Sequence, residues 1–205
     1  MSFDSASAPQ SAASLQLVTT PAASRIRRAA AIVAASLLVA VCAQIHVPVG
    51  PVPVTLQTYA VLLVGAWLGA RGGALAMALY LAEGAAGLPV FAALNAGPAA
   101  LIGPTAGYLW SFPLAAGLMG WLMERNLRRS AGRTVAAILI SSSLILLCGW
   151  TRLASLLGPA AAWRTGVVPF LPGDAAKLAL LIATLRLRNT GRRAPRGQHD
   201  ALHRA

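Results

Sequence analysis

The sequence predicts an all-α integral membrane protein with six transmembrane helices, and three observations support this prediction. Of the 205 residues, 57% are hydrophobic and 11% are charged, whereas soluble domains carry about 25% charged residues. Several apolar stretches approach the roughly 20 residues that a helix needs to cross a bilayer. Basic residues gather between these stretches rather than within them. We therefore expect one compact membrane domain and no water-soluble fold.

The N-terminal part of the chain separates into a tail, a first span and a loop. Residues 1–24 are rich in Ser, Ala and Pro and show no apolar period, which predicts a disordered cytoplasmic tail. From Arg25 onward the stretch AAAIVAASLLVAVCAQI is long enough for a first span. Three prolines then exclude a helix and predict the first outer loop: Pro48, Pro51 and Pro53.

Two short apolar stretches, about 56–68 and 73–86, are separated by only four residues, 69–72. This spacing predicts a tight helical hairpin formed by the second and third spans. Glycine recurs every fourth residue through it, which either allows the helices to approach closely or reflects how common glycine is in membrane helices: Gly65, Gly69 and Gly73.

The segment 87–104 is apolar but is interrupted by Gly and Pro, so it is not one continuous helix. Irregular backbone at membrane depth survives only where protein buries it or where it lines a cavity. We therefore expect this segment to form a wall of a binding site. The remaining spans are predicted at about 106–123, 134–150 and 174–187, with an outer loop over 151–173.

The distribution of basic residues predicts the orientation. With six spans and a cytoplasmic N-terminus, fourteen of the seventeen Arg and Lys residues fall inside, as the positive-inside rule requires. Arg152 and Arg164 fall outside, and Lys177 lies at the outer end of the last span. We therefore expect both termini in the cytoplasm, a transmembrane domain over 25–188 and a basic cytoplasmic tail over 189–205.

Charged groups in the spans are the first candidates for a binding site, because each costs several kcal/mol in lipid unless it meets a partner or a cavity. Asp174 and Lys177 stand three residues apart, so they share one helix face and can pair. Asp174 follows Pro172-Gly173, so a helix N-cap is an alternative role for it. Glu83 either takes part in binding or lies hydrated or paired near the outer interface.

Uncharged hydrogen-bonding groups at outer helix ends complete the candidate site, although a residue of this kind, taken singly, is more often a helix cap or a packing residue: Thr55, Gln57, Tyr59, Asn95, Thr105 and Tyr108. No Walker sequence, hydrolase motif or cluster of metal ligands is present. Although the net charge is +12, the basic residues follow the topology and no aromatic groove accompanies them, so nucleic-acid binding is not expected.

Three strings in order resemble the BioY family, the biotin-specific substrate-binding (S) subunits of energy-coupling factor (ECF) transporters. They are VPVTLQTYAVLLVGAWLGARGGALAMALYLAEGAAGLPVFA at 52–92, GPTAGYLWSFPLAAGLMGWL at 103–122, and FLPGDAAKLAL at 170–180. After PVFA many members have a Gly-rich run, whereas this chain has ALNAGPAAL.

The resemblance implies an ECF S-component-like bundle of six helices in the cytoplasmic membrane of a bacterium. It implies that biotin binds between the outer helix ends, with pocket residues at Gln57, Tyr59, Tyr108, Asp174 and Lys177. This chain would bind no cofactor, and ATP would be used by partner ATPase subunits that join it through a transmembrane coupling protein. Membrane lipid is a further expected partner. Capture of a different vitamin and, less plausibly, a small membrane enzyme are the alternatives.

Overall fold

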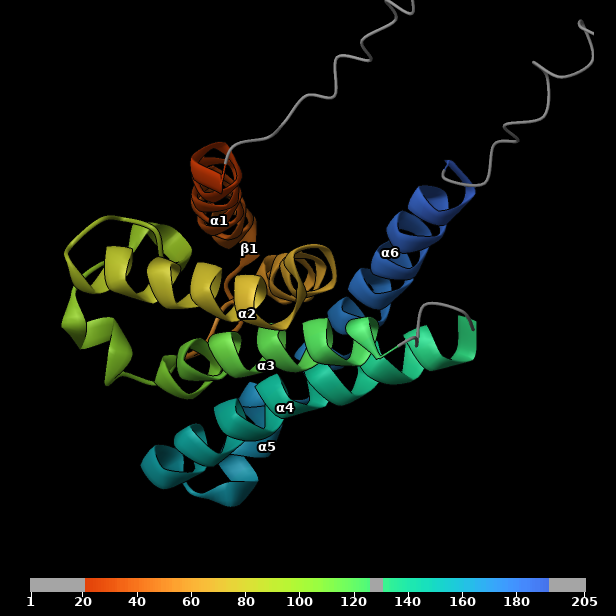
Figure 1. The fold of residues 1–205 in the computed structure, drawn as a ribbon. Coiled ribbons are helices and arrows are strands. Elements are labelled where there is room, and N and C mark those ends of the chain that lie inside the picture. Colours follow the sequence, from red (N-terminus) through yellow and green to blue (C-terminus); the bar gives the residue numbers. More distant parts are fainter. Residues whose placement is uncertain (1–20, 126–130, 192–205) are drawn as a thin grey trace, which may run out of the picture.

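The computed structural model describes residues 21–125 and 131–191, which are mostly helical (Figure 1). Most of both predicted tails therefore lies outside the described residues. The elements are α1 (Pro21–Gln44), β1 (His46–Val47), β2 (Val54–Thr55), α2 (Gln57–Ala85), the 3-10 turns η1 (Ala92–Leu94) and η2 (Pro98–Leu101), α3 (Ala106–Glu124), α4 (Ala131–Leu157), α5 (Pro159–Gly166) and α6 (Phe170–Gly191).

Helix α2 is a hairpin of two antiparallel limbs, because the chain reverses at Gly69. Gly69 has φ 76° and ψ −178°, a conformation that side chains with a Cβ rarely adopt. Gln57 Nε2 lies 2.7 Å from the Tyr80 hydroxyl, whereas a straight helix would separate these residues by about 34 Å. The predicted hairpin is confirmed, with a tighter turn than expected. Gly65 and Gly73 face each other across it, since a Cβ on Gly73 would lie 2.9 Å from Gly65 Cα.

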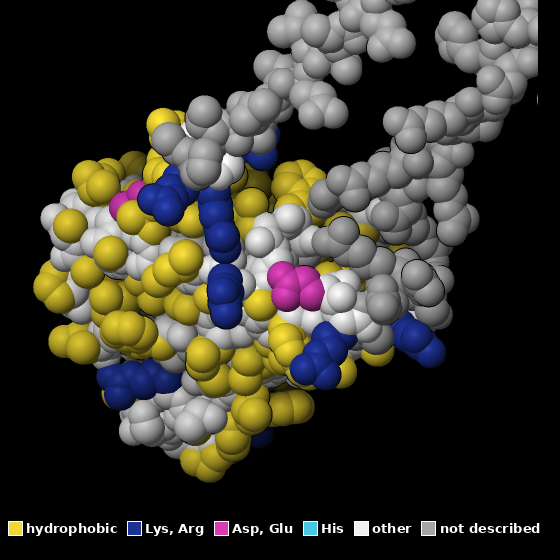
Figure 2. All heavy atoms as spheres, viewed as in Figure 1, with side chains coloured by type: hydrophobic (Ala, Val, Ile, Leu, Met, Phe, Trp, Pro, Cys, Tyr) yellow, Lys and Arg dark blue, Asp and Glu magenta, His cyan; other side chains and the backbone are white. Residues whose placement is uncertain are grey.

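The six-helix prediction fits the described residues when the two limbs of α2 are counted separately. Three helices are long and apolar enough to cross a membrane, Ala23–Gln44, Gln57–Ala85 and Gly132–Leu157, and the bent pair α5 and α6 adds a fourth candidate. Helix α2 (Gln57–Ala85) supplies two limbs. Helix α3, which packs against both α2 and α4, completes the six. Hydrophobic side chains cover much of the described face in Figure 2. This composition suits helices that face lipid.

Several predicted boundaries are wrong in the last third of the chain. The stretch 151–173 was expected to be an outer loop, but α4 continues to Leu157 and α5 follows, bent by 45° from α6. Helix α6 begins at Phe170, so Asp174 lies in its second turn and is not its N-cap. At the other end of the chain, α1 begins at Pro21 rather than at Arg25.

The hairpin turn is held against α3 at one end of the bundle. Glu124 Oε1 accepts a hydrogen bond of 2.9 Å from the Ala70 amide. A Cβ on Gly120 of α3 would lie 2.7 Å from the Gly69 carbonyl oxygen. This distance is too short for two atoms that are not bonded, and the oxygen belongs to the backbone of the turn. By contrast, a Cβ on Gly117 would lie 3.5 Å from Ala74 Cβ, an ordinary packing distance.

These two glycines give a matched pair of substitutions. We expect Gly120→Ala to lower the free energy of unfolding by about 1–3 kcal/mol, because the added methyl meets backbone that has no room to move. Gly117→Ala should leave stability unchanged or raise it by up to about 1 kcal/mol through helix propensity. Thermal unfolding of the purified protein in detergent measures both. Equal midpoints for the two variants would contradict this account of the turn.

Candidate ligand-binding site

A partly open cavity of about 350 Å³ lies among the β1–β2 segment, the start of α2, the segment between α2 and α3, and helices α3, α4 and α6. Apolar side chains make up much of its wall, including Val52, Phe91, Leu109, Phe112, Ile145 and Phe170. The size is at the lower end of the range for small-molecule sites, about 300–1,000 Å³. A cavity of this kind suits a small, largely apolar ligand with a few polar groups.

The structure brings four of the seven candidate residues to this cavity: Gln57, Asn95, Tyr108 and Asp174. Thr55 and Thr105 line it too. The three other candidates, Tyr59, Glu83 and Lys177, lie outside the lining. Tyr59 meets Thr184 of α6 through their hydroxyl oxygens, 3.1 Å apart. Glu83 accepts a hydrogen bond from the buried Ser36 hydroxyl of α1.

Asp174 brings a buried carboxylate to the cavity wall. Lys177 Nζ donates to Asp174 Oδ1 over 2.9 Å, and both side chains are more than nine-tenths buried. The second carboxylate oxygen, Oδ2, is buried and has no hydrogen-bond partner among the described residues. A buried carboxylate oxygen without a donor costs free energy, so Asp174 is suited to accept a hydrogen bond from an N–H group of a ligand.

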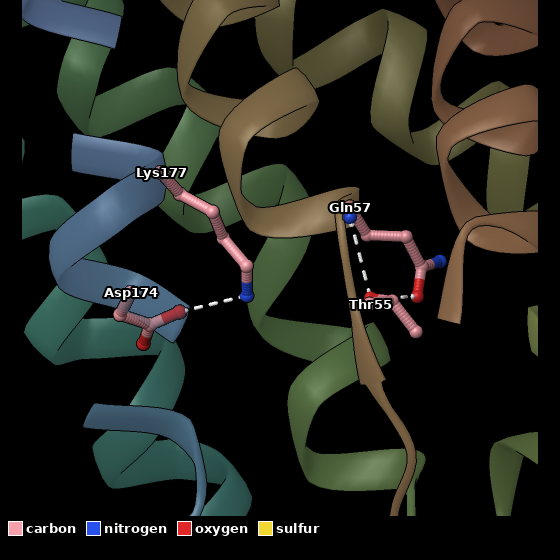
Figure 3. Close-up of polar contacts among 4 residues, drawn as sticks. All are labelled: Thr55, Gln57, Asp174 and Lys177. Atoms are coloured by element: carbon pink, nitrogen blue, oxygen red, sulfur yellow. Dashed lines mark hydrogen bonds and ion pairs between the residues drawn. The ribbon is translucent and has the colours of Figure 1, made fainter. Parts of the chain in front are cut away.

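Lys177 lies one helical turn after Asp174 and supports it. The lysine side chain extends from α6 toward Thr55 and Gln57 (Figure 3). Its ammonium group offsets the charge of the buried carboxylate. No Lys or Arg is among the residues that line the cavity, so the lining itself carries one negative group and no positive one.

Hydrogen bonds fix the orientation of the Gln57 amide. The Tyr80 hydroxyl donates to the Val90 carbonyl oxygen over 3.0 Å, so its single proton is used there. Tyr80 must therefore accept from Gln57, which places Gln57 Nε2 toward Tyr80 at 2.7 Å. The Thr55 hydroxyl donates to Gln57 Oε1 over 2.9 Å. One hydrogen of the Gln57 amide then remains for another acceptor.

Tyr80 was not among the predicted site residues, although one signal marks it. A tyrosine inside an apolar span needs a partner for its hydroxyl, and the hairpin supplies that partner on the opposite limb. Its ring also packs edge-on against Phe91, with centroids 5.5 Å apart. Tyr80 therefore links the Gln57 amide to the irregular segment that forms the cavity wall.

Tyr108 joins α3 to the region where α5 meets α6. Its hydroxyl donates to the Gly166 carbonyl oxygen over 2.7 Å. Its ring stacks on Phe170 with centroids 5.5 Å apart and planes 10° apart. Asn95 also lines the cavity, and its Oδ1 accepts a hydrogen bond from the Ala96 amide over 2.8 Å. Tyr108 thus lines the cavity with its hydroxyl already hydrogen-bonded.

The described residues do not form a metal-binding site. Within residues 21–125 and 131–191, no group of three His, Cys, Asp or Glu side chains is placed to hold a metal ion. Cys42 and Cys148 are free thiols. His46 Nδ1 lies 2.9 Å from the Gln44 carbonyl oxygen. These residues have packing and turn contacts that require no ligand.

Comparison with known proteins gives the family. The model of the BioY family matches residues 13–194. The chain belongs to the BioY family. A Pyrococcus horikoshii protein named probable biotin transporter BioY is 40% identical over 145 residues, 71% of this chain and 85% of the relative. The biotin transporter BioY of Rhodobacter capsulatus is 38% identical over 160 residues, with 71% and 84% of the two chains covered.

A solved structure has the same fold as this BioY chain. It is the S-component for biotin from an ECF-type ABC transporter, with a TM-score of 0.74 and 24% identity, and the match covers 81% of this chain and 93% of that one. The three strings that resemble the family all reach the cavity. The first supplies Gln57, the second Tyr108 and the third Asp174.

The Tyr80 hydroxyl allows a stability test with a matched control. We expect Tyr80→Phe to lower the free energy of unfolding by about 1–3 kcal/mol, because it leaves the Gln57 amide and the Val90 carbonyl without a shared partner. Tyr59→Phe, on the other limb, removes only a half-buried contact and should cost less than about 1 kcal/mol. Thermal unfolding in detergent compares the two. A larger loss for Tyr59→Phe would contradict the network described above.

Proposed function

We propose that this BioY chain is the S subunit of an ECF transporter, that it binds biotin in the cavity, and that it serves biotin uptake. The single observation that supports this assignment best is the buried, unpartnered Oδ2 of Asp174, a residue of the cavity lining in a BioY-family chain. Biotin carries a ureido ring with two N–H donors, a thioether ring and an apolar valerate chain. Its polar and apolar parts match this cavity.

The hydrogen-bonding groups suggest how the ureido ring lies. Asp174 Oδ2 accepts one ureido N–H, which supplies the donor that this oxygen lacks. The remaining hydrogen of Gln57 Nε2 donates to the ureido carbonyl oxygen. Aromatic and aliphatic side chains such as Phe91, Phe112 and Phe170 pack against the thioether ring and the valerate chain. One ureido N–H and the ureido carbonyl oxygen then each meet a group of complementary hydrogen-bonding character.

Lys177 acts through Asp174 in this proposal, because it pairs with Asp174 Oδ1 and lies outside the cavity lining. The ion pair holds the Asp174 carboxylate in one position, which orients its second oxygen as an acceptor. The alternative is that Lys177 binds the valerate carboxylate directly. The two roles differ in whether the effect of Lys177 depends on the charge of the ligand.

The binding experiment uses the purified full chain in detergent, titrated with biotin and with biotin methyl ester. We expect tight binding of both ligands. Asp174→Asn should weaken both by about tenfold or more, because a carboxylate acceptor contributes about 1.5–3 kcal/mol. Lys177→Met should weaken both by a similar factor.

The methyl ester separates the two roles of each residue. If Lys177 contacts the valerate carboxylate, Lys177→Met weakens biotin and leaves the ester unaffected. If Asp174 faces the valerate, Asp174→Asn strengthens biotin binding instead of weakening it. A folded parent that binds no biotin but binds another vitamin, such as thiamine or riboflavin, would overturn the assignment and favour the alternative S component.

For the membrane arrangement, we propose six spans in the bacterial cytoplasmic membrane with both termini inside and the cavity near the outer face. Support comes from the arginines, fourteen of seventeen basic residues being inside in this arrangement. ATP hydrolysis would take place in partner ATPase subunits, joined through a coupling protein, while this chain binds no cofactor of its own. Lipid contacts the exposed apolar side chains.

Reporter fusions test this orientation. We expect an alkaline phosphatase fused after Gly158 to be active, because that position is outside in the proposed topology, and one fused after residue 191 to be inactive. Green fluorescent protein fused at the same two positions should give the opposite pattern. Active phosphatase at residue 191 would contradict a cytoplasmic C-terminus.

A further inference from the structure

The last residue of α1, Gln44, reaches across to the turn that forms part of the cavity wall. Its Nε2 donates to the Phe91 carbonyl oxygen over 3.1 Å and to the Ala40 carbonyl oxygen over 3.2 Å. Its Oε1 accepts from the Leu94 amide over 3.0 Å. One side chain thus bonds both ends of the turn over residues 91–94.

The partners of Gln44 also fix the orientation of its amide. The Phe91 carbonyl can only accept and the Leu94 amide can only donate, so the nitrogen must face Phe91 and the oxygen must face Leu94. To make both bonds, a side chain at position 44 needs a donor and an acceptor side by side at its end, as the amide of glutamine provides. Glutamate supplies only acceptors when it is ionised, and leucine supplies neither.

The turn that Gln44 holds has an unfavourable backbone. Ala93 has φ 57° and ψ 37°, and Leu94 also has φ 57°. These are left-handed conformations for residues that carry a Cβ, which cost about 1–2 kcal/mol each. A turn of this kind persists only where its surroundings hold it. Phe91, Ala92, Ala93 and Asn95 all line the cavity, so relaxation of the turn would change the cavity wall.

We propose that Gln44 is a positioning residue for the ligand cavity, which clamps the turn at 91–94 in its left-handed conformation and thereby slows the opening of the cavity. The clamp itself is a property of the ligand-free chain, while its effect on a ligand rests on the proposed binding of biotin. Residues 91–95 follow the second limb of α2 in the chain, whereas the clamp comes from α1 (Figure 1). The cavity wall is therefore tied to two different helices.

The first experiment measures biotin dissociation from the full chain in detergent. We expect Gln44→Leu to raise the dissociation rate by about tenfold, because two hydrogen bonds to the turn are lost. Gln44→Glu keeps the acceptor for Leu94 and places an oxygen against the Phe91 carbonyl, and it should raise the rate at least as much. It also provides a second variant of similar size if Gln44→Leu fails to fold.

A rescue experiment separates clamping from a general packing role. Glycine adopts left-handed conformations without the steric cost, so Ala93→Gly with Leu94→Gly should make the turn less dependent on the clamp. The dissociation rate of this pair in the parent background is the reference for the comparison. In the Gln44→Leu background, it should recover most of the lost residence time. Additive effects of the two changes would overturn the proposal.

A second measurement needs no ligand and keeps this proposal distinct from the assignment of biotin. Hydrogen exchange at the Leu94 amide should be about tenfold faster in Gln44→Leu, in the absence of any vitamin. If the parent binds no biotin but exchange accelerates, the clamp exists and the function assigned to the cavity is wrong. Unchanged exchange at Leu94, or faster exchange with unchanged biotin dissociation, would overturn the role of Gln44 in the cavity.

Discussion

The structure depends on one constraint, which is that the backbone between α2 and α3 is not α-helical and must find other hydrogen-bond partners inside the protein. Side chains from four helices meet that need. Tyr80 donates to one carbonyl of the segment, and Gln44 bonds a carbonyl and an amide. At the far end of the segment, Trp110 donates to the Leu101 carbonyl oxygen. Arg152 donates to the carbonyl oxygens of Ile102 and Gly103. Because side chains of the surrounding helices supply hydrogen bonds to the segment, it can keep an irregular conformation and leave a cavity beside it.

Local sequence was enough to predict the hairpin and the fourth span, because glycine spacing and apolar length are local signals. It misled at α6, where Pro172-Gly173 suggested a turn and made Asp174 a candidate N-cap. The structure places Pro172 in the first turn of a helix that begins at Phe170, where a missing N–H costs nothing. The bend of 45° between α5 and α6 lies where Tyr108 of α3 contacts Gly166 and Phe170, and such contacts between distant segments are not visible in local sequence.

The candidate site was predictable in part, and helix geometry explains which part. Asp174 and Lys177 are three residues apart, share a face and pair as expected. Gln57 and Tyr59 are two residues apart, so they point to different faces, and only Gln57 reaches the cavity. Predicting Tyr80 as the partner of Gln57 would have required knowledge of how the two limbs of the hairpin align. A reversal at Gly69 brings residues about equally distant from it together, as the contact between Gly65 and Gly73 already indicates.

Two polar residues of the cavity lining, Asp174 and Gln57, share one arrangement, in which an internal partner satisfies one part of the polar group and leaves another part without a partner. Lys177 takes one oxygen of Asp174 and leaves Oδ2 without a donor. Tyr80 takes one hydrogen of Gln57. A ligand-free carboxylate oxygen of this kind disfavours the empty state, so a ligand that donates an N–H gains both a hydrogen bond and relief of that cost. Specificity in the proposed site then depends on the direction of a few hydrogen bonds held rigidly by residues that the ligand does not touch.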